Sequence, residues 1–217
     1  IDMFPLDFKE FACAVGVNEH IISTLKEHFE DRTKVDEFVH SRMLDVFYLY
    51  LIVGGMPEAV VMYNDSNDLA KVGSIHDKII RLYKQDFSKY EKTYKLKLQE
   101  IYDSMPGQLD QKNKRFQLNI LGQGMNYDRV ANDFLWLKDA GVAIPVYNIR
   151  EPKLPLIISE NRNLFKLFFS DIGLLTSCYS NQTKLAILNK DASINNGALF
   201  ENAVAQELLA KGHKEYY

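Results

Sequence analysis

Residues 54–58, with the sequence GGMPE, constrain the fold of this chain more than any other stretch. Residues 35–53 contain neither glycine nor proline, and a helical pattern resumes over residues 58–63. Two glycines permit a tight, sterically open turn, and a proline is tolerated in the first turn of a helix, where its missing N–H costs nothing. The pattern therefore predicts a corner between two helices. It leaves two interpretations open: a plain structural corner, which is the commoner case, or a backbone and a rigid ring that approach a flat ligand.

The composition is that of an ordinary globular protein, since 47% of the 217 residues are hydrophobic and 25% are charged. A net charge of −3 provides no bulk basic field that would attract nucleic acid or anionic lipid. The two cysteines lie far apart and the five histidines lack metal-site spacing, which argues against a disulfide scaffold or a zinc site. No apolar run approaches the ~20 residues that a membrane helix needs. We therefore expect a cytoplasmic protein with no membrane partner.

Apolar residues at helical spacing predict a helical bundle over residues 1–92. Asp7, with Glu10 three residues later, has the form of a capping box, and Asn18 is suited to cap the following helix. A long amphipathic helix is expected from Leu69 to the end of this part.

Residues 93–180 predict a different module. A helix ends near Pro106, and a short helix at 116–121 and a longer one at 127–140 follow, with strands over 142–149 and 163–170. Three helices followed by a two-stranded wing is the order of a winged helix, although other short α+β modules share it.

The last part opens with a predicted short helix over 171–176 and a polar linker over 180–183, and a helix is expected over 193–211. The sequence therefore predicts a mainly α (α+β) fold in three consecutive parts. The motifs GxxxxGK[ST], GxGxxG and GxSxG do not occur in it. We therefore assign no catalytic residue and expect no catalysis by this chain alone.

Two groups of residues are candidates for contact with nucleic acid. Arg129 and Asn132 lie on the third helix of the predicted winged helix, where a DNA reader places its base contacts, but Asp128 and Asp133 on the same helix oppose a phosphate backbone. Lys84 and Lys89 belong to a basic stretch, residues 81–97, in which acidic residues are interleaved. Packing against protein is the favoured interpretation, and DNA binding stays open as the alternative.

Glu201 lies beside an apolar arc of the last helix that Phe200, Val204 and Leu208 form. A carboxylate at the border of a buried face can bind a metal ion or act as a general base. More often it reaches solvent or bonds to a neighbouring backbone group. The pattern alone leaves both interpretations open.

Six segments, in this order, resemble a large bacterial and archaeal family that joins an AAA-type P-loop ATPase to a C-terminal domain of unknown function. They are FPLDFKEF (4–11), YLIVGGMPEAV (50–60), YKQD (83–86), WLKDAG (136–141), SDIGLL (170–175) and GALFENAVAQEL (197–208).

The resemblance implies a helical ATPase lid at 1–92, a winged-helix domain at 93–180 and the start of a degenerate PD-(D/E)XK nuclease-like α/β domain at 181–217. It implies that Gly54, Gly55 and Pro57 line a nucleotide and that Glu201 contributes to a metal site. ATP and Mg²⁺ are then cofactors of the intact parent protein, and none is expected in this chain.

The departures from that family are equally informative. The P-loop, the Walker B carboxylates and the remaining nuclease residues are absent from the sequence. We therefore expect the chain to be a piece of a longer protein, with an N-terminal ATPase core as its missing partner. DNA or another protein is a further candidate partner.

Overall fold

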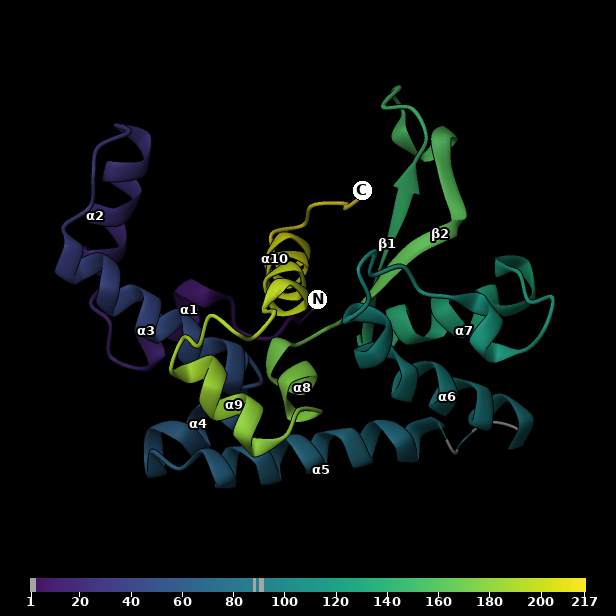
Figure 1. The fold of residues 1–217 in the computed structure, drawn as a ribbon, viewed down its shortest axis with the longest axis horizontal. Coiled ribbons are helices and arrows are strands. Elements are labelled where there is room, and N and C mark those ends of the chain that lie inside the picture. Colours follow the sequence, from purple (N-terminus) through teal and green to yellow (C-terminus); the bar gives the residue numbers. More distant parts are fainter. Residues whose placement is uncertain (1–2, 88, 90–91) are drawn as a thin grey trace. The chain divides into compact units, whose positions relative to one another are not determined.

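The computed structural model describes residues 3–87, 89 and 92–217; the side chains of residues 92–95 are outside the description. In this part of the chain, helices dominate and one antiparallel pair of strands forms the sheet (Figure 1). The predicted mainly α (α+β) class is therefore confirmed. The helices are α1 (Phe8–Ala14), α2 (Glu19–Glu30), α3 (Glu37–Val53), α4 (Pro57–Ser66), α5 (Leu69–Phe87), α6 (Lys92–Leu109), α7 (Tyr127–Asp139), α8 (Ile172–Ser177), α9 (Asn181–Leu188) and α10 (Gly197–Ala210). The strands are β1 (Ala143–Ile149) and β2 (Glu160–Phe169), and the 3₁₀ helices are η1 (Leu118–Leu121) and η2 (Leu156–Ser159).

The chain divides into two compact units. Unit 1 contains Ile1–Asp77 and Asp171–Asn196, and unit 2 contains Lys78–Ser170 and Gly197–Tyr217. Both units are discontinuous in the sequence, whereas the predicted lid, winged helix and nuclease-like start are consecutive segments. The assignment of those three domains stays a prediction.

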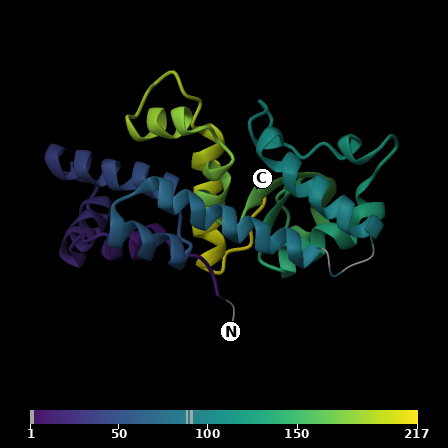
Figure 2. The ribbon, with the colours of Figure 1, turned by 90° about the horizontal axis from the view of Figure 1, so that it is seen from below.

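Unit 1 is helical, and α1 and α2 begin at side chains that cap them. Asp7 and Glu10 form the predicted capping box of α1, and Asn18 caps α2 as predicted. In both views the purple-to-blue helices α1, α3 and α4 lie against one another (Figure 1, Figure 2). Tyr50 of α3 is fully buried at their centre, and its ring centroid lies 5.1 Å from that of Phe11. Helix α8 packs against the same α3.

Unit 2 is built around the β1–β2 hairpin. Ala143 pairs with Phe169 and Tyr147 with Phe165, and the register shifts at a bulge between Tyr147 and Asn148. Helix α7 lies against β1, and helix α6 against β2. The core is aromatic: the ring centroids of Phe134 and Phe165 are 4.8 Å apart. Aromatic side chains bury a large apolar area, and edge-to-face pairs also fix the relative orientation of the two rings.

Four local predictions need correction. The helix predicted to end near Pro106 continues to Leu109, so the proline lies inside α6. The predicted short helix over 116–121 is a 3₁₀ helix of four residues. The predicted polar linker at 180–183 is the start of α9, because the Ser180 side chain accepts a hydrogen bond from Thr183 N and caps a helix. The last helix begins at Gly197 rather than near residue 193.

Within the described residues, no single helix has the length and apolar character to cross a membrane. The pair α3 and α4 meets that criterion only when both are counted together, and a bend of 120° separates them.

Candidate functional site

The corner at residues 54–58 separates α3 from α4, and two of its features require glycine. Gly54 has a φ of +73°, a conformation that residues with a side chain rarely adopt. A Cβ added to Gly54 would collide with Asp171 Oδ1 and lie 2.7 Å from Gly173 N. A Cβ on Gly55 would collide with the carbonyl oxygen of Leu6. Both glycines are buried, so the open faces that the sequence predicted are occupied by neighbouring backbone and by Asp171.

Asp171 supplies the acceptor that the corner needs. Its fully buried carboxylate accepts hydrogen bonds from Gly55 N at 2.6 Å and from Leu174 N at 3.1 Å. The backbone N–H groups of Met56 and Gly173 also bond to it. One side chain therefore satisfies free donors at the starts of both α4 and α8, which have no partner within their own helices. Burial raises the pKa of Asp171 to about 6, although these four hydrogen bonds act in the opposite direction.

The carbonyl groups at the end of α3 also find buried partners. His76 Nε2 donates to Val53 O at 3.0 Å, and the Thr176 hydroxyl lies 3.4 Å from Ile52 O. His76 is 2% exposed and Thr176 is 0% exposed. Burial lowers the pKa of His76 to about 4, so the ring is neutral near pH 7. Asp171, His76 and Thr176 thus provide hydrogen-bond partners for backbone groups at the break between α3 and α4. Buried backbone groups need such partners.

The N-terminal segment joins the same corner. Leu6 N donates to Gly55 O at 2.8 Å, and the Tyr50 hydroxyl donates to Leu6 O at 3.0 Å. Three of the six ATPase-like segments, at 4–11, 50–60 and 170–175, therefore meet at Gly55. Sequence analysis selected all three segments but did not predict their contact, since no local signal reports a partner 116 residues away.

The three predicted nucleotide-lining residues have different surroundings. Gly54 and Gly55 are buried, whereas Pro57 is exposed at the first position of α4. Nucleotide contact by these residues stays a prediction, and Pro57 is the member of the trio whose side chain a ligand can reach.

Glu201, the predicted metal ligand, lies in unit 2 and forms ion pairs with two lysines. Its carboxylate oxygens are 3.3 Å from Lys114 Nζ and 2.7 Å from Lys166 Nζ. Burial alone would raise the pKa of Glu201, but the two ammonium groups outweigh that effect and lower it. Among the described residues, no group of three His, Cys, Asp or Glu side chains is arranged to hold a metal ion. The metal role of Glu201 stays a prediction.

The apolar arc beside Glu201 faces the opposite way from that expected. Phe200, Val204 and Leu208 are 37%, 56% and 38% exposed, and the buried face of α10 carries Leu199 and Ala203. The neighbouring Asn202 explains this orientation. Its side-chain Oδ1 accepts a hydrogen bond from Phe169 N at 2.8 Å, and its Nδ2 donates one to Phe169 O at 3.1 Å. These two bonds hold the Asn202 face of α10 against the end of β2.

The candidate nucleic-acid residues all lie in unit 2. Arg129 and Asn132 are exposed on α7, and Arg129 Nη1 donates to Gly124 O at 3.3 Å. Lys84 Nζ is 2.6 Å from Asp103, and Lys89 Nζ is 2.7 Å from Asp86, so a carboxylate compensates each charge. The remaining side chains of the basic stretch at 90–95 lie outside the described residues.

One residue of α7 has a different role from that expected. Asp133 is 2% exposed and pairs with Lys97 at 3.4 Å. It therefore does not face a ligand, and the objection to DNA binding that the sequence placed on it does not hold.

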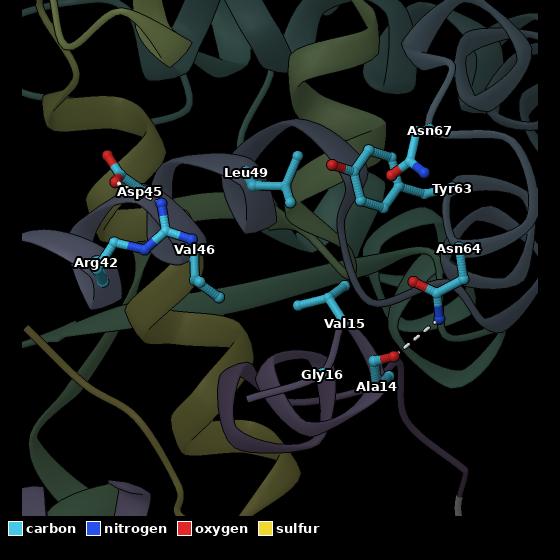
Figure 3. A pocket seen from close by; sticks show the side chains of 10 residues that line it. All are labelled: Ala14, Val15, Gly16, Arg42, Asp45, Val46, Leu49, Tyr63, Asn64 and Asn67. Carbon is cyan, nitrogen blue, oxygen red and sulfur yellow. Dashed lines mark hydrogen bonds and ion pairs between the residues drawn. The ribbon is translucent and has the colours of Figure 1, made fainter. Parts of the chain in front are cut away.

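Unit 1 also carries an open groove of about 520 Å³ between α1, α3 and α4 (Figure 3). Val15, Val46 and Leu49 give it an apolar lining, and Arg42 and Asp45 lie at one side. None of the site residues predicted from the sequence is among the residues that line it. Sequence analysis gave no signal for this groove, because its walls come from three separate helices.

Comparison with known proteins identifies a family. Residues 44–185 match the family described as Domain of unknown function (DUF8612), and the chain belongs to it. The matched region contains the corner, His76, Asp171 and Thr176, and hence nearly the whole hydrogen-bond network described above. No curated protein and no solved structure matches the chain.

Proposed function

We propose that this member of the DUF8612 family is the lid and winged-helix portion of an AAA-type ATPase, and that it responds to nucleotide without hydrolysing it. The observation that supports this most is the meeting of three ATPase-like segments at Gly55, where Leu6 and Asp171 both bond to its backbone. In this proposal ATP and Mg²⁺ are held mainly by a cytoplasmic ATPase core outside this chain.

The proposal assigns the nucleotide contact in this chain to Pro57. Its ring is exposed and rigid, and it occupies the first position of α4, where proline is well tolerated. A flat base can pack on such a ring by apolar contact. The two glycines act indirectly, since they allow the close backbone packing that positions the ring.

The hydrogen bonds of Gly55 offer a route for the response. Leu6 belongs to the segment that enters unit 1, and Asp171 belongs to the segment that follows β2 directly. Movement of the corner would strain both contacts at once, because buried hydrogen bonds cannot be replaced by water. Nucleotide at Pro57 would thereby act on the N-terminal segment that contains Leu6 and on the segment that joins β2 to α8.

The experiment measures ATP affinity in the protein that carries the proposed ATPase core. We expect Pro57→Ala to weaken ATP binding by about tenfold, the value of roughly 1.4 kcal/mol of lost apolar contact. Val61→Ala is the matched control, because Val61 is 57% exposed on the same helix and should leave affinity unchanged. Equal affinity in the wild type and Pro57→Ala would refute the assigned contact. Gly55 variants are unsuitable, since any side chain there collides with Leu6.

The alternative function is a DNA-binding winged helix linked to a nuclease-like domain. The observation in its favour is the exposure of Arg129 and Asn132 on α7, the helix that precedes the hairpin. Binding to duplex DNA that weakens with salt and is lost in Arg129→Ala, but not in the exposed control Arg32→Ala, would support it. No binding at low salt would exclude it.

A further inference from the structure

A small groove lies within unit 1, between the first turns of α5 and helix α9. Its volume is about 160 Å³, and apolar side chains form most of its walls: Ile52, Leu69, Val72, Leu185 and Leu188. Gly73 of α5 also lines it, and a Cβ added to Gly73 would meet nothing within 4 Å. The groove therefore has open space beside Gly73 that a ligand can fill without moving the backbone.

His76 is the most buried of the polar residues that line this groove. It lines the groove although only 2% of it is exposed. Its Nε2 lies 3.0 Å from the carbonyl oxygen of Val53, and because a carbonyl only accepts, Nε2 must carry the proton. In a neutral imidazole the other nitrogen, Nδ1, is then an acceptor.

Lys184 contributes a positive charge at the same groove. Its ammonium group lies 3.4 Å from Ser177 O, a long contact with a neutral group. Burial lowers the pKa of Lys184, although the charges of Asp77 and Cys178 act in the opposite direction. A half-buried ammonium group beside apolar walls is poorly solvated, and an anionic ligand would compensate it.

We propose that this groove binds a short aliphatic acid that carries a hydroxyl group. Its carboxylate pairs with Lys184, its hydrocarbon chain lies over Gly73 against Leu185 and Leu188, and its hydroxyl donates to His76 Nδ1. The groove is well below the ~300–1,000 Å³ of sites for drug-sized ligands, so the acid must be short.

The site has a direct connection to the corner. His76 bonds through Nε2 to Val53, the last residue of α3 and the neighbour of Gly54. A ligand on Nδ1 polarises the same ring and strengthens its hydrogen bond to Val53. The acid would therefore stabilise the corner between α3 and α4 through the hydrogen bond from His76 to Val53. This binding does not depend on nucleotide contact at Pro57, and its test is independent of that proposal.

The experiment titrates the whole chain with 3-hydroxybutyrate and follows backbone amide shifts by NMR. Saturable shifts at Gly73, His76 and Lys184 with a millimolar dissociation constant are expected. Butyrate, which lacks the donor, and 3-hydroxybutyramide, which lacks the charge, should each bind more weakly. Lys184→Met should weaken binding about tenfold, as loss of one charged hydrogen bond implies. Lys71→Met is the control, because Lys71 is exposed on α5 and outside the groove lining, and the affinity of this variant should be unchanged.

A second variant tests the location. Gly73→Leu fills the open space and should abolish binding while the chain stays folded, since glycine is the poorer helix former. The proposal is overturned if no saturable shifts occur, if either control ligand binds as tightly as 3-hydroxybutyrate, or if Lys184→Met or a folded Gly73→Leu variant binds normally.

Discussion

The carboxylate of Asp171 accepts a hydrogen bond of 2.6 Å from the backbone N–H of Gly55, which lies 116 residues earlier in the chain. This contact ties the start of α8 to the break between α3 and α4. It makes the corner a buried junction in which Gly55 N, Gly55 O and Val53 O each have a specific partner. The stability of unit 1 should depend on it more than on any exposed helix cap.

Replacement of Asp171 should be strongly destabilising. Asp171→Ala leaves the N–H groups of Gly55 and Leu174 buried without an acceptor, at a cost of about 1–3 kcal/mol for each group. We expect the free energy of unfolding to fall by about 3 kcal/mol in urea titrations. Asp36→Ala is the matched control: Asp36 caps α3 at an exposed site, so its loss should cost only about 1 kcal/mol. Equal losses in the two variants would contradict the assigned role of Asp171.

The glycines of unit 1 should respond to alanine in opposite directions. Gly55→Ala places a methyl group against Leu6 O and should destabilise by several kcal/mol, of the order expected for overpacking or more. Gly73→Ala adds the same methyl group where nothing lies within 4 Å, inside α5, and should stabilise by about 1 kcal/mol. Urea unfolding of both variants measures the difference, and a neutral Gly55→Ala would show that Leu6 does not pack on the corner.

Acid should weaken unit 1 through His76. Its pKa is about 4 in the folded protein and 6.5 ordinarily, so the unfolded chain binds more protons between these values. Stability is therefore full above about pH 6.5 and is lost as the pH falls towards 4, by up to about 3 kcal/mol. His76→Gln should remove this dependence. The difference in free energy of unfolding between wild type and variant should grow as the pH rises through this window.

Asp171 should act in the opposite sense over nearly the same window. Its pKa is raised from 3.8 to about 6, so the folded protein binds the extra proton, and its contribution to stability falls as the pH rises between those values. In wild type the two effects partly cancel, whereas in His76→Gln the dependence of Asp171 should appear alone. Parallel pH profiles of wild type and His76→Gln would contradict the assignment of His76. Lys184 and Asp77 carry the charges that act on His76, so their variants should be measured alongside.

The ion pair of Glu201 and Lys166 should contribute modestly to unit 2. The side chains are 39% and 18% exposed, so solvent screens part of the attraction across their 2.7 Å contact. A double-mutant cycle with Glu201→Gln and Lys166→Met should give a coupling free energy of about 1 kcal/mol that decreases with salt. A coupling of zero would mean that the Glu201–Lys166 pair does not stabilise unit 2, although Lys114 would still face the same carboxylate at 3.3 Å.

Sequence patterns predicted the elements that depend on near neighbours. Asp7 with Glu10, and Asn18, mark helix starts through side chains two or three residues from their partners, and the structure confirms them. The polar run at 180–183 was interpreted wrongly because Ser180 can either continue a loop or cap a helix, and only the packing of α9 decides between them. Packing also decides which face of α10 is buried, because apolar residues lie on two of its faces.

The contacts of the corner could not be predicted in the same way. A pair of glycines indicates that another group packs closely against the backbone, but it does not identify that group. Here the approaching groups are Leu6 and Asp171, which lie far from Gly55 in the sequence, and the local patterns around them predicted only helices. The hydrogen bonds of His76 and Thr176 to α3 were not predicted, since a single histidine or threonine on a helix commonly makes no buried hydrogen bond.

Hydrogen exchange at the Gly55 amide tests the junction most directly. In the wild type we predict that Gly55 N–H exchanges as slowly as the core amides of α3, because Asp171 holds it in a fully buried site. In Asp171→Ala, exchange should accelerate at Gly55, Met56 and Leu174, while the exposed α2 amides remain unchanged. A Gly55 amide that exchanges at the rate of an open loop in the wild type would contradict the junction and the role of the corner that is built on it.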